Sequence, residues 1–462
     1  MFSSIYNCFA FVIRSILNCA DTQLYLSYLC ISPSKSKTLN IILTKWFPEI
    51  FESGNISRIL TPYFFDRKNV ISKIYIFVNE CIQSNSVSLL IRLASKLDTA
   101  MADCISDYTT DEEIYGLNSN SKEQQVQLLP RCHCKWAHKN KDKNCSIDLN
   151  NFLEHFYYVD TKALYEKTHC SVSHVFLESS TFSRAEERGY LSIGISALSD
   201  QIELDSILAD DHKRCSFIVN SISNVDLLVK NALSIQKKAM QEGVDILCFP
   251  EMLGHPKVNR ALKEKLADYP EDDLLDYSAL TICPTYWNDH TNKAEVINKF
   301  GEQVIAQAKQ IPYPLPSQGK QYIEDIRPDH HIHLIHCEGI GRMAVIICKD
   351  AIDRDYLFNL INELKVTLLF VPSFSTGFYD FQENLSLCRA FDCTAVWINC
   401  CSVCLMTGKE KLEKIGTILK TGRRSQFKNG YYHFTHKNCT KENAGGCHNC
   451  LYIQHICFNS QI

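Results

Sequence analysis

The chain has 462 residues, of which 45% are hydrophobic and 22% charged, as in an ordinary soluble globular protein of two or three domains. Its formal net charge of −4 is small for this length, which argues against a chain-wide nucleic-acid or membrane-surface role. No apolar run approaches the roughly 18 residues of a membrane span, so we expect no membrane partner.

Cysteine is abundant, with 23 residues. The segment Met1–Asn7 has no basic residues, and Arg14 interrupts the apolar stretch that follows, so the start is not typical of a secretory signal peptide. We therefore predict a cytoplasmic, reducing location. In that setting we expect the cysteines to be free, metal-bound or catalytic rather than paired in disulfides.

The first part of the chain has the periodicity of helices. Apolar residues recur every three or four positions from Phe2 to Leu17, and again in Ile71–Ile82 and Val87–Leu97. A polar stretch from Asn118 to Ser146 predicts a loop, and further helix is expected over Leu149–Lys167. We predict a mainly α-helical domain over residues 1–185, with no role assigned to it.

From about residue 190 the pattern changes to alternating strands and helices. The expected strands are Tyr190–Ile195, Val244–Phe249, Ala344–Ile347, Thr367–Val371 and Ala395–Asn399, and the expected helices are Ile222–Glu242 and Glu383–Cys393. Buried strands that alternate with helices predict an α/β layered domain, here over residues 190–425. The remaining residues, 426–462, form a Cys/His-rich tail.

Three residues could act together, and the first and last of them end short apolar runs typical of buried strands. Glu251 follows Phe249-Pro250, Lys309 lies between the strand patterns, and Cys348 ends an apolar run. A buried carboxylate suits proton transfer near neutral pH, and an ammonium group would lower the pKa of a thiol and stabilise a developing oxyanion. Together they provide the base, cation and nucleophile needed for acyl transfer at a carbon–nitrogen bond.

Each of these residues also has an ordinary structural interpretation. Cys348 alone would be read as a small buried hydrophobic residue, and Glu251 as a helix cap. Lys309 would be a solvated lysine after a hairpin, with Lys299 and Lys320 as alternatives for the cation. The joint occurrence of the three residue types favours the catalytic interpretation.

The sequence resembles a known family in these segments. Phe249-Pro250-Glu251-Met252, the segment Gly301–Lys309 and the segment Gly339–Asp350 resemble the nitrilase (carbon–nitrogen hydrolase) superfamily, in the order Glu, Lys, Cys and with the spacings of that family. The resemblance covers residues 190–425. It implies a four-layer αββα sandwich of nitrilase type and pairing into a homodimer or larger homo-oligomer.

The resemblance also implies roles for individual residues. Glu251 would be the general base, and Cys348 would attack the substrate carbon to form a thioester or thioimidate. Lys309 would stabilise the oxyanion together with the backbone N–H of Lys349. Glu324 lies where the family often has a second carboxylate, which would orient the lysine or position the substrate. No cofactor is required for this chemistry.

The leading functional hypothesis is a thiol hydrolase that acts on an amide, with a nitrile as the less favoured substrate. Two alternatives stay open: a nitrilase-fold regulatory or binding module in a multidomain, bacterial-defence type of protein, and an amide-forming acyltransferase. Gln310–Pro314 and Cys400–Cys404 depart from the family pattern, which leaves the identity of the small-molecule substrate open.

Two Cys-containing stretches could bind a metal. The tail residues Cys439, Cys447, Cys450 and Cys457 include one CxxC pair, which fits either a structural zinc or free thiols. A second candidate set is Cys132, Cys134, His138 and Cys145. The basic run Arg131–Lys143 around Trp136 fits either a nucleic-acid contact or a solvated loop.

Overall fold

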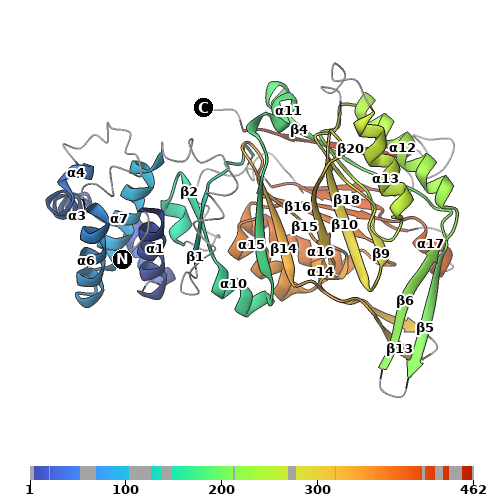
Figure 1. Ribbon diagram of the computed structural model, residues 1–462, viewed down its shortest axis with the longest axis horizontal. Coiled ribbons are helices and arrows are strands. Elements are labelled where there is room, and N and C mark those ends of the chain that lie inside the picture. Colours follow the sequence, from blue (N-terminus) through green and yellow to red (C-terminus); the bar gives the residue numbers. More distant parts are fainter. Residues whose placement is uncertain are drawn as a thin grey trace. The chain divides into compact units, whose positions relative to one another are not determined.

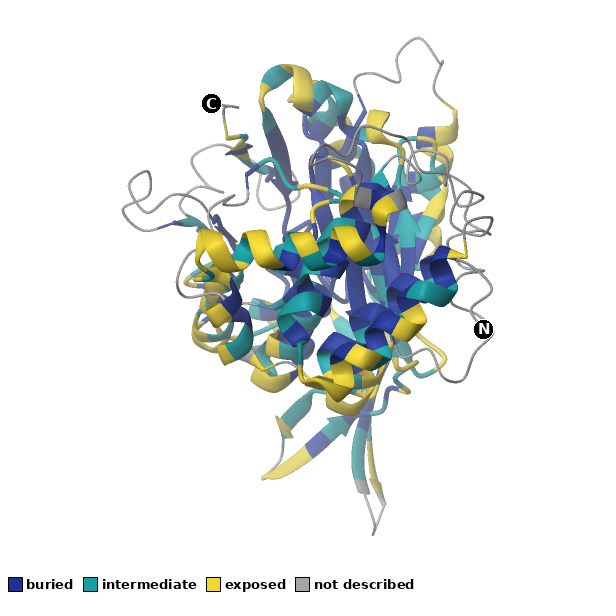
Figure 2. Cartoon of the chain, turned by 90° about the vertical axis from the view of Figure 1, so that its left-hand side faces the viewer, coloured by how far each residue is buried: buried dark blue, intermediate teal, exposed yellow. Residues whose placement is uncertain are grey.

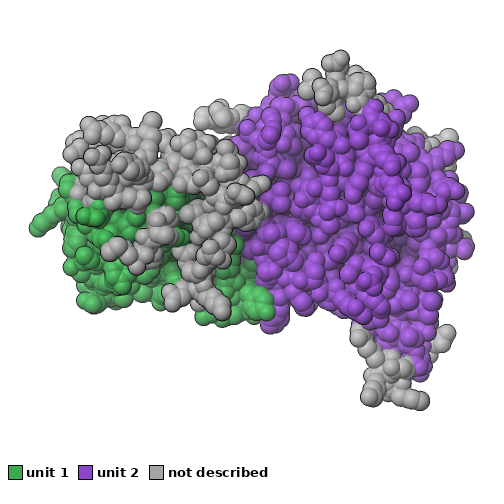
Figure 3. Space-filling view, viewed as in Figure 1, with its two compact units in different colours: residues 1–131, 140–166 green, residues 132–139, 167–462 purple. Residues whose placement is uncertain are grey.

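The computed structural model describes most of the chain, in eleven stretches. These are residues 5–19, 21–51, 69–102, 126–136, 148–211, 214–268, 277–317, 319–407, 412–421, 430–435 and 450–459. The chain divides into two compact units, residues 1–131 with 140–166 and residues 132–139 with 167–462 (Figure 3).

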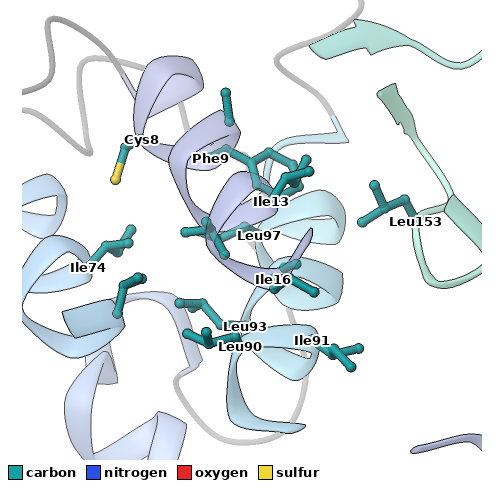
Figure 4. Packing of buried hydrophobic residues seen from close by; sticks show 14 of the residues in the cluster. Cys8, Phe9, Ile13, Ile16, Ile74, Leu90, Ile91, Leu93, Leu97 and Leu153 are labelled. Atoms are coloured by element: carbon teal, nitrogen blue, oxygen red, sulfur yellow. The ribbon is translucent and has the colours of Figure 1, made fainter. Parts of the chain in front are cut away.

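Helices dominate the first unit, as the sequence predicted. They are α1 (Ile5–Cys19), α2 (Thr22–Leu29), α3 (Pro33–Trp46), α4 (Pro48–Phe51), α6 (Val70–Gln83) and α7 (Val87–Ala100). Phe9, Ile13 and Ile16 lie on one face of α1 and pack with Leu93 and Leu97 of α7 in a shared apolar core (Figure 4). The helices carry exposed residues on their other faces (Figure 2).

The expected helix over 149–167 is only partly correct. A short 3₁₀ turn (Leu149–Phe152) is followed by strand β2 (Phe156–Asp160), which pairs antiparallel with β1 (Val126–Pro130), and helix α10 (Thr161–Thr168) comes after it. The aromatic and β-branched residues of β2 favour an extended strand over a helix. Within the described ranges, no helix is both long and apolar enough to cross a membrane.

Two seven-stranded sheets form the centre of the second unit. The first has the order β11-β10-β8-β7-β4-β20, with β9 paired to β10, and the second has the order β19-β18-β17-β16-β15-β14-β3. The strands of the first sheet are β4 (Tyr190–Ile195), β7 (Ile246–Cys248), β8 (Leu280–Ile282), β9 (Tyr286–Asn288), β10 (Thr291–Asn298), β11 (Gln303–Ala308) and β20 (Tyr452–Cys457). Those of the second are β3 (Ser171–Phe176), β14 (His331–Cys337), β15 (Gly341–Val345), β16 (Leu368–Ser373), β17 (Thr394–Asn399), β18 (Gly416–Leu419) and β19 (Tyr431–Phe434).

The two sheets pack against each other through closely fitting side chains. A Cβ atom at Gly416 of β18 would lie 2.5 Å from Ile195 Cδ1 of β4, so the two sheets approach each other closely there. Helices α12 (Val225–Gln241) and α13 (Pro256–Ala267) cover the first sheet. Leu228 and Ile235 of α12 belong to the apolar core between these helices and the sheet.

The second sheet is accompanied by its own helices. These are α14 (Lys349–Ile352), α15 (Arg354–Leu364) and α16 (Tyr379–Leu385), and they lie together beside β15 and β16 (Figure 1). The order of layers is therefore helix, sheet, sheet, helix. This is the α/β sandwich that the sequence predicted, and helices precede it in the chain.

Both central sheets take strands from outside residues 190–425. β3 pairs parallel with β14, and β20 pairs antiparallel with β4. The expected helical domain and the expected tail thus each contribute an outer strand. These strands satisfy backbone groups that would otherwise form an exposed sheet edge.

A third, four-stranded sheet was not anticipated from the sequence. Its order is β12-β13-β6-β5, formed by β5 (Leu204–Asp211), β6 (Arg214–Ile222), β12 (Pro314–Ser317) and β13 (Lys320–Glu324). It extends away from the two larger sheets (Figure 1). The hairpin β5–β6 lies between β4 and α12 in the chain, where the sequence analysis identified no element.

Candidate active site

Strand ends bring the three predicted catalytic residues together. Glu251 follows β7, Lys309 follows β11, and Cys348 follows β15. β7 and β15 are parallel to neighbouring strands in their own sheets, so the residues after them emerge at the carboxyl ends of those strands. All three side chains are buried, and all three line one cavity.

Cys348 occupies a strained backbone position. Its φ is +48° and its ψ is −101°, a conformation that non-glycine residues rarely adopt. Its N–H donates to Pro372 O at 2.9 Å, which ties the turn to the end of β16. Lys349 is the first residue of α14, so its N–H has no acceptor within that helix. The turn therefore presents a thiol next to a backbone donor that the helix does not use.

Lys309 is held between two carboxylates. Its Nζ lies 2.9 Å from Glu251 Oε1 and 2.7 Å from Glu324 Oε2. Burial by itself would lower the pKa of the Lys309 ammonium, but Glu251 and Glu324 raise it well above its ordinary value. The ammonium group therefore stays charged.

The two alternative lysines lie elsewhere. Lys320 is exposed and forms its ion pair with Asp210, and Lys299 lies over the ring of Phe300. Neither lines the cavity that contains Cys348.

Glu251 is positioned by residues that sequence reasoning missed. Asn292 Nδ2 donates to its Oε1 at 2.8 Å, and Phe374 N–H donates to its Oε2 at 2.8 Å. Asn292 is itself fixed by Thr285, whose Oγ1 donates to Asn292 Oδ1 at 2.7 Å. Asn292 lies at the start of β10, and nothing in its sequence context marks it, because only the sheet brings it to Glu251.

The pKa of Glu251 is raised, first by burial and then by the charge of Glu324, while Lys309 acts in the opposite direction. A carboxylate with a raised pKa is a better proton acceptor at neutral pH than a solvated one. Glu251 is therefore a buried carboxylate with a raised pKa, the environment that the sequence analysis expected for the base.

The ammonium of Lys309 lowers the pKa of the Cys348 thiol, as expected, but other influences outweigh it. Burial, followed by the charge of Glu251, raises the pKa of Cys348 well above its ordinary value, and the opposing influence of Lys309 is smaller. The thiol therefore holds its proton more tightly than a solvated thiol does. The proton has to leave Sγ as the sulfur attacks, and Glu251 is the neighbouring base.

Glu324 lies at the end of β13 and has no exposed surface. Its Oε2 accepts from Lys309 Nζ and, at 3.0 Å, from Tyr313 N–H. Its other oxygen, Oε1, is buried and accepts no hydrogen bond from any described residue. An unused buried acceptor is unfavourable unless a ligand donates to it.

Asp350 ties the two catalytic loops together through backbone N–H groups. Its carboxylate accepts from Ile311 at 2.7 Å, Gln310 at 3.1 Å and Ile347 at 3.1 Å. Burial raises the pKa of Asp350 to about 7. Asp350 does not line the cavity.

The cavity has a volume of about 70 Å³. Its lining combines the ionisable groups with an apolar wall: Leu204, Ser206, Phe217, Val219, Glu251, Met252, Lys309, Tyr313, Leu315, Glu324, Cys348 and Phe374. An apolar wall with a few convergent ionisable groups is typical of small-molecule binding.

The predicted metal sites are not assembled by the described residues. Cys439 and Cys447, like His138 and Cys145, lie outside these residues. Cys450 is buried and disulfide-bonded, so the expectation that the cysteines are unpaired is wrong at this position. Cys457 is an exposed free thiol. In the described part of the chain, no three His, Cys, Asp or Glu residues are grouped as metal ligands.

The basic stretch is only partly described. Arg131 donates to Phe156 O and Asn150 O, and Trp136 is buried and stacks on Phe458. Trp136 is therefore not available to stack on a base. Lys139, Lys141 and Lys143 lie outside the described residues.

Comparison with known proteins finds similar solved structures at low sequence identity. No family model matches the chain, and no curated protein matches it. Similar solved structures include an amidase variant from Nesterenkonia sp. AN1 in complex with acrylamide, with 12% identity, a TM-score of 0.36, and coverage of 58% of this chain and 91% of that one. Another is Nit3 of Saccharomyces cerevisiae, described as a member of branch 10 of the nitrilase superfamily, with 10% identity, a TM-score of 0.36, and coverage of 58% and 90%.

Proposed function

We propose that the second unit is a thiol hydrolase that cleaves the carbon–nitrogen bond of a small amide. The observation that carries this proposal is the buried Glu251–Lys309–Glu324 set next to Cys348 at a strained turn. Buried charges of this kind often reduce stability relative to apolar side chains, so their presence favours a functional role. Strained backbone conformations are also frequent at active sites. All four residues line one cavity.

The first half of the reaction forms a thioester. Glu251 accepts the proton of Cys348 as Sγ attacks the carbonyl carbon. The carbonyl oxygen becomes an oxyanion, which Lys309 Nζ and the N–H of Lys349 stabilise. When the tetrahedral intermediate collapses, the C–N bond breaks, and Glu251 returns its proton to the departing ammonia or amine.

The second half restores the enzyme. Water attacks the thioester carbon while Glu251 accepts one of its protons, and the carbon–sulfur bond breaks. The acid is released and Sγ recovers the proton. Glu324 would receive an N–H of the substrate amide at its unused Oε1, which would orient the bond to be broken.

The test is intact-protein mass spectrometry of the full chain after exposure to a library of amides. We expect a mass increase equal to an acyl group on Cys348, together with released ammonia. Cys348→Ala should show neither, while Cys404→Ala, which alters a half-buried cysteine outside the cavity, should show both. Normal ammonia release by Cys348→Ala would rule out the assignment.

A further inference from the structure

The strand that leads to Lys309 has one open side. β11 is the last strand of its sheet among the described residues. On one side it pairs with β10, and Lys309 N–H donates to Asn292 O of that strand at 2.8 Å. The opposite side of β11 pairs with no described strand. The buried backbone groups on that side therefore need partners other than a strand of the same sheet.

Two glutamine side chains supply such partners. Gln307 Nε2 and Gln310 Nε2 both donate to Ala308 O, at 3.0 and 2.8 Å. Both also donate to His331 O of β14, at 2.8 and 3.3 Å. Gln307 Oε1 accepts from His333 N–H at 2.9 Å. The side-chain amide of Gln307 thus bonds to β14 as a peptide group of a neighbouring strand would, and it joins the first sheet to the second.

Gln310 is anchored at further points. Its Nε2 also donates to Asp329 Oδ1 at 2.8 Å, so its two N–H groups serve three acceptors. Its backbone N–H donates to Asp350 Oδ1 at 3.1 Å. Gln307 and Gln310 are 1% and 7% exposed, and buried polar networks with their hydrogen bonds made are rigid. Gln310 begins the segment that departs from the nitrilase pattern, so the resemblance assigns it no role.

These bonds connect the cation with the nucleophile, which lie on different sheets. Lys309 follows β11 of the first sheet, and Cys348 follows β15, which pairs with β14 in the second. A lysine side chain is a flexible four-carbon stem, so the place of its ammonium depends on where the backbone is held. A misplacement of about 1 Å at an active site can reduce the rate by roughly a hundredfold.

We infer that Gln307 and Gln310 are positioning residues: they join the open side of β11 to β14 and so hold Lys309 in place beside the nucleophile. The inference rests on the proposed function, in which Lys309 stabilises the oxyanion. Neither glutamine lines the cavity, so neither would touch the substrate. Because Ala308 O accepts from both, either glutamine alone still bonds the peptide group that precedes Lys309.

Leucine variants remove the amide groups at a similar side-chain size. Gln307→Leu and Gln310→Leu should each lower kcat about two- to fourfold, since one donor to Ala308 O remains. The double variant should lower kcat at least about thirtyfold, more than the product of the single losses, with KM changed by less than about twofold. Gln303→Leu, at an exposed position of the same strand, should leave both values unchanged. The substrate is the amide from which the unmodified chain releases ammonia fastest.

A second readout does not need turnover. Lys309 opposes the rise in the pKa of the Cys348 thiol, so a displaced ammonium leaves less thiolate at about pH 8. We expect iodoacetamide to alkylate Cys348 at least about threefold more slowly in the double variant than in the unmodified chain. Peptide mass spectrometry follows Cys348 and, as the reference, the exposed Cys457, which should react at the same rate in all variants.

Urea unfolding shows which variants are folded under the assay conditions. If the double variant is unfolded, the single variants decide: lower kcat and slower Cys348 alkylation in both support the inference, and unchanged values overturn it. Lower stability of a folded double variant with unchanged kcat and unchanged alkylation would mean a merely structural role, and the inference would be wrong. If the unmodified chain releases ammonia from no amide, the proposed hydrolysis is wrong, and the alkylation rates alone decide the positioning role.

Discussion

Lys309 Nζ lies 2.7 Å from Glu324 Oε2, and neither side chain is more than 2% exposed. Glu251 lies on the other side of the same ammonium, at 2.9 Å. One positive charge therefore stabilises two buried negative charges. Loss of the cation would leave both carboxylates unpaired, which makes Lys309 the most sensitive position of the site for stability.

Replacement of Lys309 by methionine should destabilise the chain. We expect the free energy of unfolding to fall by about 3–5 kcal/mol, the usual result of removing one partner from a buried ion pair. Adding Glu324→Gln to the same chain should recover part of this loss, because one unpaired charge is then removed. Urea unfolding of the three proteins measures both effects.

The matched control is Lys320→Met, which removes an exposed lysine from its pair with Asp210. Its unfolding curve should stay close to that of the unmodified chain, because exposed pairs contribute little. Equal losses in Lys309→Met and Lys320→Met would contradict the buried arrangement.

Asn292→Ala should change the pH dependence of activity. Asn292 donates to Glu251 and so stabilises its charged form, and the variant should therefore raise the pKa of Glu251 further. Activity falls as the pH drops through this pKa, because a protonated Glu251 cannot accept the thiol proton. The acidic limb of kcat/KM should thus lie above pH 4.5 and move to higher pH in the variant.

The control for this shift is Asn288→Ala, which truncates an exposed asparagine on β9. Its acidic limb should coincide with that of the unmodified chain. If Asn292→Ala lowered the rate equally at all pH values, the hydrogen bond would not act on the ionisation of Glu251.

Asp350→Asn should reduce both stability and turnover. The amide has one acceptor oxygen in place of two, so at least one of the N–H groups of Gln310, Ile311 and Ile347 would lose its partner. We expect a loss of about 1–3 kcal/mol in the free energy of unfolding. The value of kcat should fall at least tenfold, because the loops of Lys309 and Cys348 lose their common support.

Asp355→Asn serves as the matched substitution, since Asp355 is exposed at the start of α15. It should leave kcat unchanged. Loss of stability in Asp350→Asn with full kcat would show that Asp350 supports the fold but does not position the catalytic residues.

The buried pair His174–His336 should make stability depend on pH. The ring nitrogens are 2.9 Å apart, and burial lowers the pKa of His174 to about 3 and that of His336 well below its ordinary value. Between the unfolded value of about 6.5 and the folded value, the unfolded chain binds more protons. Stability should therefore be complete above about pH 6.5 and decrease as the pH falls toward 3, by up to about 1.4 kcal/mol per pH unit for each histidine.

Denaturant unfolding between pH 4 and 7 measures this slope. His174→Gln removes one titrating group, so its slope should be shallower. His330→Gln, at an exposed position just before β14, should keep the slope of the unmodified chain. An unchanged slope in His174→Gln would mean that other groups cause the pH dependence.

The sequence predicted the layered α/β part because its strands carry short apolar runs between helices. Tyr190–Ile195 and Ala395–Asn399 are strands close to their expected bounds, and Ile222–Glu242 contains α12. It missed the hairpin β5–β6, whose residues alternate between a cavity face and an exposed face without an extended apolar run. It also assigned helix to Phe156–Asp160, which is a strand paired with β1.

By itself, the sequence determined the kind of chemistry to expect, because Glu251 and Cys348 each follow an apolar run that marks a strand end and Lys309 lies between them in the chain. Tertiary structure alone decided the environment of that chemistry. Asn292 and the wall of Phe217 and Val219 reach the site only through sheet pairing, and the upward shift of the Cys348 pKa follows from burial among them. Local residue patterns fix secondary structure, whereas desolvation and contact depend on residues far apart in the chain.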